Sequence, residues 1–75
     1  MSEREPKIVN ALGLSCPMPA MLARQALVEM SAGRIEILVD NGTSCENVNR
    51  LAEREGWKVD ISEDADGNYK LVLSK

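Results

Sequence analysis

Residues 16–19 of the chain read CPMP, which places one of its two cysteines directly before a proline. Proline lacks an amide hydrogen and has a φ close to the helical value, so it fits the first position of a helix. It also favours extended backbone in the preceding residue, which is the conformation of an N-cap. The pattern therefore predicts that Pro17 opens a helix with Cys16 as its N-cap. Pro19 disfavours a helical Met18, so a start two residues later stays open.

A cysteine at the start of a helix gains nucleophilicity from the backbone. This end of a helix carries roughly half a positive charge, and the amides of Met18 and Ala20 are free to face the sulfur of Cys16. Helix N-termini lower the pKa of a thiol from about 8.5 to ~3.5–7.5. No histidine is present to act as a base, and this mechanism needs none. The residues alone leave a second interpretation open, a buried Cys16 that only packs.

The second cysteine, Cys45, is expected as the second residue of a later helix, at the same edge of the fold as Cys16. It is either a resolving thiol that forms a disulfide with Cys16 or a small packing residue. The packing role is favoured because the neighbouring Glu46 opposes thiolate formation.

The methionines Met18, Met21 and Met30, taken with Cys16, are ligand types that suit Cu(I). Methionine at helical spacing more commonly fills a core, so neither a metal site nor a cofactor is expected. Met18, at the edge of the motif, is an alternative contact for a partner protein.

Two charged features have simple interpretations. Arg24 is expected to be solvated or paired with an acid such as Glu29 or Asp40, although a partner contact is the alternative. The acidic stretch at residues 62–66 is expected to be a soluble hairpin turn.

Hydrophobic periodicity predicts six elements in the order βαβαββ. The expected ranges are a strand at 7–12, a helix at 17–30, a strand at 34–40, a helix between about 43 and 56, and strands at 57–63 and 69–75. The first helix should bury Met18, Met21, Leu22, Ala23, Ala26, Leu27 and Met30.

Local signals place the ends of the later elements. Thr43 and Glu46 match a capping box at the start of the second helix, and Gly56 suits its C-terminal end. Asp66-Gly67 suits the turn of the final hairpin. The inward residues are expected to be Val48, Leu51 and Ala52 on the helix and Trp57, Val59, Ile61, Tyr69, Leu71 and Leu73 on the hairpin.

A right-handed βαβ crossover places both helices on one face of the sheet. The expected fold is therefore a two-layer α/β sandwich with a mixed four-stranded sheet. Both helices should begin at the same edge, above the carboxyl ends of the first two strands.

Length and composition limit the class of protein. A chain of 75 residues is one domain, with residues 1–6 expected as a flexible tail and a mainly aliphatic core, since only one Trp, one Tyr and no Phe are present. The net charge of −3 and the scattered basic residues argue against direct binding to nucleic acid or to an anionic membrane. With no visible signal peptide, the expectation is a cytoplasmic protein with free thiols, and a monomer.

The stretch LGLSCPMPAMLAR (residues 12–24) resembles the signature of the TusA (SirA-like) family of sulfur carriers. The matching positions are Leu12, Gly13, Leu14, Cys16, Pro17, Pro19 and Arg24. The later part of the chain resembles the YedF-like branch, which is associated with selenium metabolism. The resemblance implies a fold like the C-terminal domain of translation initiation factor 3.

The resemblance also implies a function. Cys16 would carry sulfur as a persulfide, with Pro17 and Pro19 shaping the helix start around it. The sulfur would come from a cysteine desulfurase or a rhodanese-like donor and pass to an acceptor protein. Members that serve tRNA thiolation carry an acid between the prolines and a basic residue before the cysteine, where this chain has Met18 and Ser15. The alternatives are a noncatalytic interaction or regulatory module and a selenium-handling protein.

Overall fold

The computed structural model describes residues 7–14, 18–30 and 32–75. It has the order βαβαββ that the sequence predicts. The elements are β1 (Lys7–Asn10), α1 (Met18–Glu29), β2 (Arg34–Val39), α2 (Gly42–Arg54), β3 (Lys58–Glu63) and β4 (Tyr69–Ser74).

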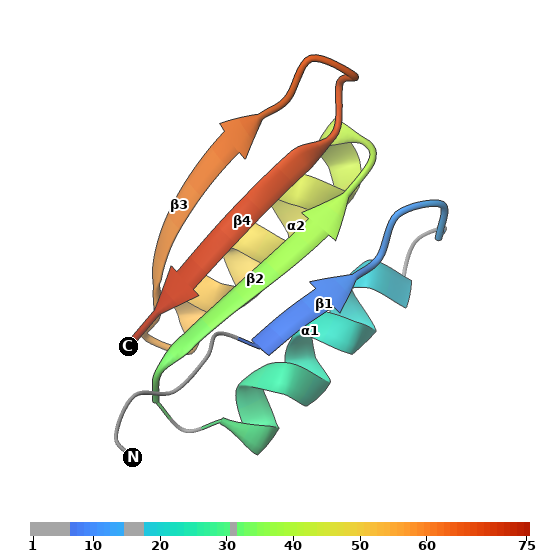
Figure 1. Cartoon of the computed structure of the whole chain (residues 1–75). Coiled ribbons are helices and arrows are strands. Elements are labelled where there is room, and N and C mark those ends of the chain that lie inside the picture. The colour runs from blue at the N-terminus through green and yellow to red at the C-terminus, as the bar shows by residue number, and fades with distance from the viewer. Residues whose placement is uncertain (1–6, 15–17, 31) are drawn as a thin grey trace.

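The four strands form one mixed sheet in the order β1-β2-β4-β3. β1 runs parallel to β2, and β4 is antiparallel to both β2 and β3. Both helices cover the same face of the sheet, and β1 and β2 end at the same edge (Figure 1). The two-layer sandwich predicted from the crossover rule is confirmed.

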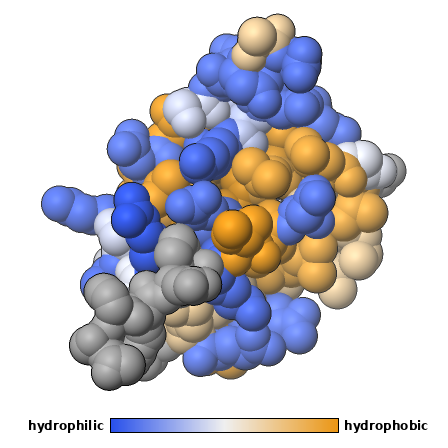
Figure 2. Space-filling view, in the orientation of Figure 1, coloured by the Kyte–Doolittle hydropathy of each residue, from blue (hydrophilic) through white to orange (hydrophobic). Residues whose placement is uncertain are grey.

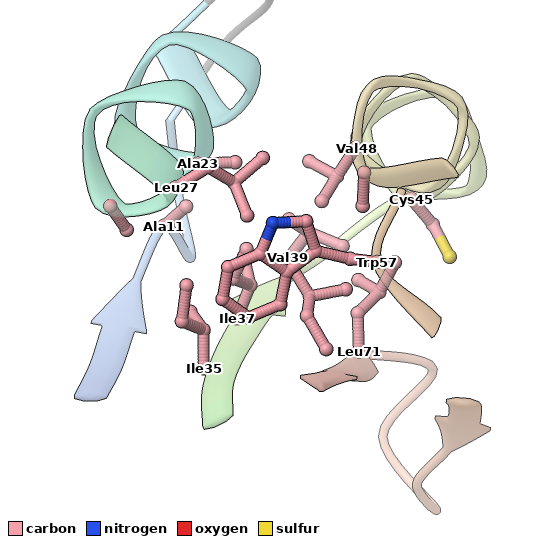
Figure 3. Packing of buried hydrophobic residues seen from close by; sticks show 13 residues of the cluster. Ala11, Ala23, Leu27, Ile35, Ile37, Val39, Cys45, Val48, Trp57 and Leu71 are labelled. Carbon is pink, nitrogen blue, oxygen red and sulfur yellow. The ribbon is translucent and has the colours of Figure 1, made fainter. Parts of the chain in front are cut away.

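The core lies between the sheet and the two helices. Alternate residues of β2 and β4 face the helices because side chains alternate along a strand. Trp57 lies among them with 5% of its surface exposed, between α1 and α2 (Figure 3). Burying one aliphatic side chain contributes roughly 1.5–3 kcal/mol, so this layer holds the helices on the sheet. The fully enclosed aliphatic side chains from the strands are Ile35, Ile37, Val39, Leu71 and Leu73.

The buried stripe of α1 differs from the predicted one. Its buried residues are Pro19, Ala23, Ala26 and Leu27, with Leu22 and Met30 packed at the margin. Met18 and Met21, expected inside, are 42% and 57% exposed. They lie with Val28 on the solvent side of the helix, so apolar residues occupy both faces of α1 and the periodicity is ambiguous.

The predicted capping box of α2 is wrong. Asn41 is the N-cap, with extended backbone at φ −156° and ψ 161°, and its side-chain oxygen accepts a hydrogen bond from the Ser44 amide at 2.8 Å. The helix therefore begins before Thr43. Asparagine is as good an N-cap as serine or threonine, and here it comes first along the chain.

The final hairpin follows the prediction with one exception. Gly67 in the turn and Gly56 after α2 have positive φ values of 83° and 86°, as their positions require. Val59 is partly buried, but Ile61 is 43% exposed. Ile61 pairs with Leu71 and so faces the same side of the sheet. It remains exposed on β3, which is an edge strand with a neighbour on one side only.

The other face of the sheet is open to solvent. Its residues include Ile8 on β1 and Leu38 on β2, alternating with polar side chains. Figure 2 shows this face, with apolar side chains gathered toward β1 and β2 and polar ones around them. Within the described part of the chain, neither helix has the length and apolar character to cross a membrane.

Candidate functional site at the start of α1

The candidate site lies where the chain leaves β1 and enters α1. Ser15, Cys16 and Pro17 fall outside the described residues, so the predicted N-cap geometry stays a prediction. The residues on both sides of them are described, up to Leu14 and again from Met18. The site is therefore described through these two segments, which precede and follow the cysteine in the chain.

The incoming loop, residues 11–14, is held by the backbone. Ala11 is completely buried, and its amide donates to the carbonyl of Leu38 at 2.9 Å. The amide of Leu14 donates back to the Ala11 carbonyl at 3.3 Å, and that of Leu12 to the side-chain oxygen of Asn10 at 3.0 Å. The loop thus turns tightly over the end of the sheet.

Gly13 connects this loop to the end of β2. Its φ of 78° is in the left-handed region that favours glycine. Its amide donates to Oδ2 of Asp40 at 2.7 Å, a short bond typical of a charged acceptor. Oδ1 of the same carboxylate accepts from Nδ2 of Asn41 at 2.9 Å, and Asn41 caps α2 through Ser44. These hydrogen bonds therefore join the loop at residues 11–14 to the start of α2.

The first turn of α1 combines a rigid anchor with an uncharged surface. Pro19 is almost wholly enclosed, and both it and Met18 are helical, so the later start that Pro19 left open is not used. The described first turn contains no acidic residue. A thiolate beside this turn would meet the helix dipole without an opposing carboxylate from the turn itself.

Cys45 is placed differently from the expectation. It is the fourth residue of α2, and 5% of its surface is exposed. Its sulfur points away from α1 (Figure 3). Burial, with a smaller contribution from the charge of Glu46, raises the pKa of this thiol. Cys45 is therefore a packing residue, which agrees with the favoured interpretation, and its raised pKa disfavours the thiolate.

The methionines do not form one cluster. Met30 packs at the margin of the core just beyond the end of α1. Met18 lies 12 residues earlier, about 18 Å along a helix axis. The described residues also contain no group of three or more His, Cys, Asp or Glu side chains placed to hold a metal.

Arg24 is exposed on α1. The acids suggested as its partners are engaged elsewhere. Glu29 forms an ion pair with Lys7 at 3.3 Å, and Asp40 bonds Gly13 and Asn41.

The sequence reading missed the role of Asp40. A polar residue directly after a strand, at the edge where a neighbouring strand also ends, is the signal that points to such a contact. Its partner 27 residues away becomes apparent only when β1 and β2 are paired in register.

Comparison with known proteins identifies the family. The family model described as sulfurtransferase TusA matches residues 7–75. The chain belongs to the TusA family. The match includes both helix starts and the whole sheet, and so covers every element described above.

Individual TusA relatives agree with this assignment. A candidate sulfur carrier protein of Methanocaldococcus jannaschii is 30% identical over 70 residues, which cover 92% of this chain and 93% of the relative. The sulfur carrier protein TusA of Allochromatium vinosum is 25% identical over 68 residues, covering 89% of this chain and 90% of that protein.

A solved structure supports the fold. The crystal structure of a SirA-like protein from Desulfitobacterium hafniense matches with a TM-score of 0.84 and 32% identity. The match covers 89% of this chain and 93% of that one. The resemblance to the TusA or SirA-like family of sulfur carriers is confirmed, as is the βαβαββ fold with its mixed four-stranded sheet.

Proposed function

We propose that Cys16 carries sulfur as a persulfide between a donor protein and an acceptor protein. The observation that carries the proposal is the position of this cysteine in a TusA-family chain, two residues before the first described residue of α1. A chain without histidine must activate its thiol by other means, and a helix start provides them.

The transfer needs no added oxidant. The Cys16 thiolate attacks the outer sulfur of a donor persulfide. A new sulfur–sulfur bond forms on Cys16, the donor's own sulfur–sulfur bond breaks, and the electron pair leaves with the donor thiolate. In the second half of the cycle a nucleophile on the acceptor attacks the outer sulfur, and Cys16 leaves as a thiolate.

The start of the helix stabilises both anionic forms of Cys16, the thiolate and the persulfide anion. Amides in the first turn that lack a helical partner donate to an anion, and the described first turn of α1 has no acid to oppose it. One unit of pKa corresponds to about 1.4 kcal/mol. Even a modest shift therefore raises the thiolate fraction severalfold at neutral pH.

A cysteine desulfurase or a rhodanese-like protein is the proposed donor. The side chains of Met18 and Met21, exposed at the start of α1, provide an apolar contact for such a partner. Methionine adapts its shape to different surfaces, which suits a carrier that meets a donor and an acceptor in turn. The resemblance of the later stretch to the YedF-like branch is the reason to test selenium beside sulfur.

Intact-mass spectrometry tests the carrier function. The protein is incubated with a cysteine desulfurase and free cysteine, and its mass is measured with and without reductant. The expected result is a reductant-labile gain of one sulfur atom. It should be absent in Cys16→Ser and retained in Cys45→Ala. A parallel sample with selenocysteine and a selenocysteine lyase tests selenium.

The two variants separate the carrier from a noncatalytic interaction module. A module that only binds partners would gain no sulfur, even if it bound the desulfurase. A gain that persists in Cys16→Ser and disappears in Cys45→Ala would place the chemistry on the wrong cysteine and reject the proposal.

A further inference from the structure

We infer that Asp40 is a positioning residue for the Cys16 site, an inference that rests on the proposed carrier function. It lies just beyond the end of β2 and does not belong to the CPMP run. Its carboxylate holds residues 11–14, the loop that precedes Cys16 in the chain. Without that contact, the loop would be free to shift relative to the start of α1.

The contact with Gly13 fixes the path of the loop. Gly13 stands three residues before Cys16, and its amide reaches Oδ2 of Asp40 at 2.7 Å. The positive φ of 78° at Gly13 turns the chain at this point. A charged acceptor forms one of the stronger hydrogen bonds available to a backbone amide, so it selects one conformation of a short loop.

The second oxygen of Asp40 ties this loop to a rigid part of the fold. It accepts from Asn41 at 2.9 Å, and Asn41 itself caps α2 at Ser44. Ser44 is 2% exposed, so the cap is anchored in the packed interior. The position of the loop before Cys16 is therefore fixed relative to the start of α2, as well as by its direct connection to β1.

The two ways in which Asp40 could act, through its charge or through its hold on the loop, predict opposite effects of its removal on the reactivity of Cys16. A carboxylate close to a thiol raises the thiol pKa by repulsion, so removing the charge alone would make Cys16 more reactive. If Asp40 acts by holding the loop at Gly13, its removal lets that loop shift relative to the start of α1, and Cys16 becomes less reactive. The direction of the change therefore identifies the cause.

The test compares Asp40→Ala, Asp40→Asn and Asp64→Ala. All three are made in a Cys45→Ala background, so that Cys16 is the only thiol that reacts. Asp64 is the matched control. It is also an exposed carboxylate, and it accepts from the amides of Asp66 at 2.9 Å and Asn68 at 3.1 Å. It lies in the turn between β3 and β4, on the other side of β2 from the Cys16 loop.

The readouts are the rate of Cys16 alkylation by iodoacetamide between pH 5 and 10, the rate of sulfur loading, and the thermal midpoint. We expect Asp40→Ala to raise the apparent pKa of Cys16 and to slow both reactions at pH 7 by about tenfold. Asp40→Asn keeps one oxygen for Gly13 and should stay within about threefold of the parent. Asp64→Ala should match the parent in both rates.

Other outcomes reject the inference. They are an Asp40→Ala variant that reacts within about twofold of the parent, faster alkylation in both Asp40 variants, or equal slowing in Asp40→Ala and Asp64→Ala. If the parent gains no sulfur, the carrier proposal fails, but the alkylation profile still decides whether Asp40 positions the thiol.

Discussion

The two helices begin at the same edge of the sheet, and each has a cysteine near its start, yet the two starts are built differently. The start of α2 is closed by the side chain of Asn41, and Cys45 lies inside the helix, its amide already bonded to the Asn41 carbonyl at 3.1 Å. The start of α1 has the CPMP run, with Cys16 ahead of the described helix. Nearness to a helix N-terminus is common to both thiols.

The comparison shows that burial outweighs the helix dipole at Cys45. A side chain inside the first turns leans back along the helix surface and packs against its neighbours. For Cys45 that surface faces the core, so desolvation raises the thiol pKa despite the nearby positive end. A cysteine before the first turn is free to face the amides instead. The position relative to the cap decides which effect dominates.

The largest expected difference between the two thiols is in alkylation of the folded protein. Cys16→Ser leaves only Cys45, and Cys45→Ala leaves only Cys16. We expect Cys16 to react with iodoacetamide at pH 7 about 100-fold faster than Cys45, because the buried thiol must wait for a local opening. The measurement is the loss of free thiol over time by intact mass.

Denaturation provides the control for this comparison. In urea both thiols should react at similar rates, because neither the helix start nor the burial persists. Comparable rates in the folded protein would show that the two helix starts do not differ in the way the sequence and the structure indicate.

A smaller effect is expected from removing the cap of α2. Asn41→Ala deletes the acceptor for the Ser44 amide and should lower the free energy of unfolding by about 1 kcal/mol. Urea unfolding measures the loss, and Asn41→Ser, which restores a capping oxygen, should recover most of it. An unchanged midpoint in Asn41→Ala would mean that α2 does not depend on its side-chain cap.

The fold was predictable because its signals are local and agree with one another. The Val/Ile/Leu-rich strands and the glycine-marked ends specify six elements in order, and the crossover rule then places the helices. The errors arise where a local pattern is ambiguous. Thr43 and Glu46 match a capping box, but Asn41 caps the helix earlier. Met21 fits the helical period, but α1 buries a stripe that excludes it.

The candidate site was predictable only in part. Its cysteine and prolines form a contiguous motif, and a contiguous motif is visible in sequence. Asp40 acts across 27 residues, through a contact that exists only because β1 and β2 are adjacent and parallel. Contacts of this kind depend on register, which no short window of sequence contains.

The smallest expected effect is a contrast in how the two thiols couple stability to pH. The pKa of Cys45 is raised in the folded state, so above about pH 8.5 the unfolded chain loses this proton first and stability falls as pH rises. A lowered pKa at Cys16, as proposed, has the opposite sign. It adds stability as pH rises through the folded pKa toward about 8.5, and that stability is then retained.

Urea midpoints from pH 5 to 10 in reductant check both signs. Relative to the parent, Cys45→Ala should lose less stability at high pH, and Cys16→Ser should lack the rise below pH 8.5. If both variants shift in the same direction, the thiols share one kind of environment, and the distinction between a position before the helix and one inside it is wrong.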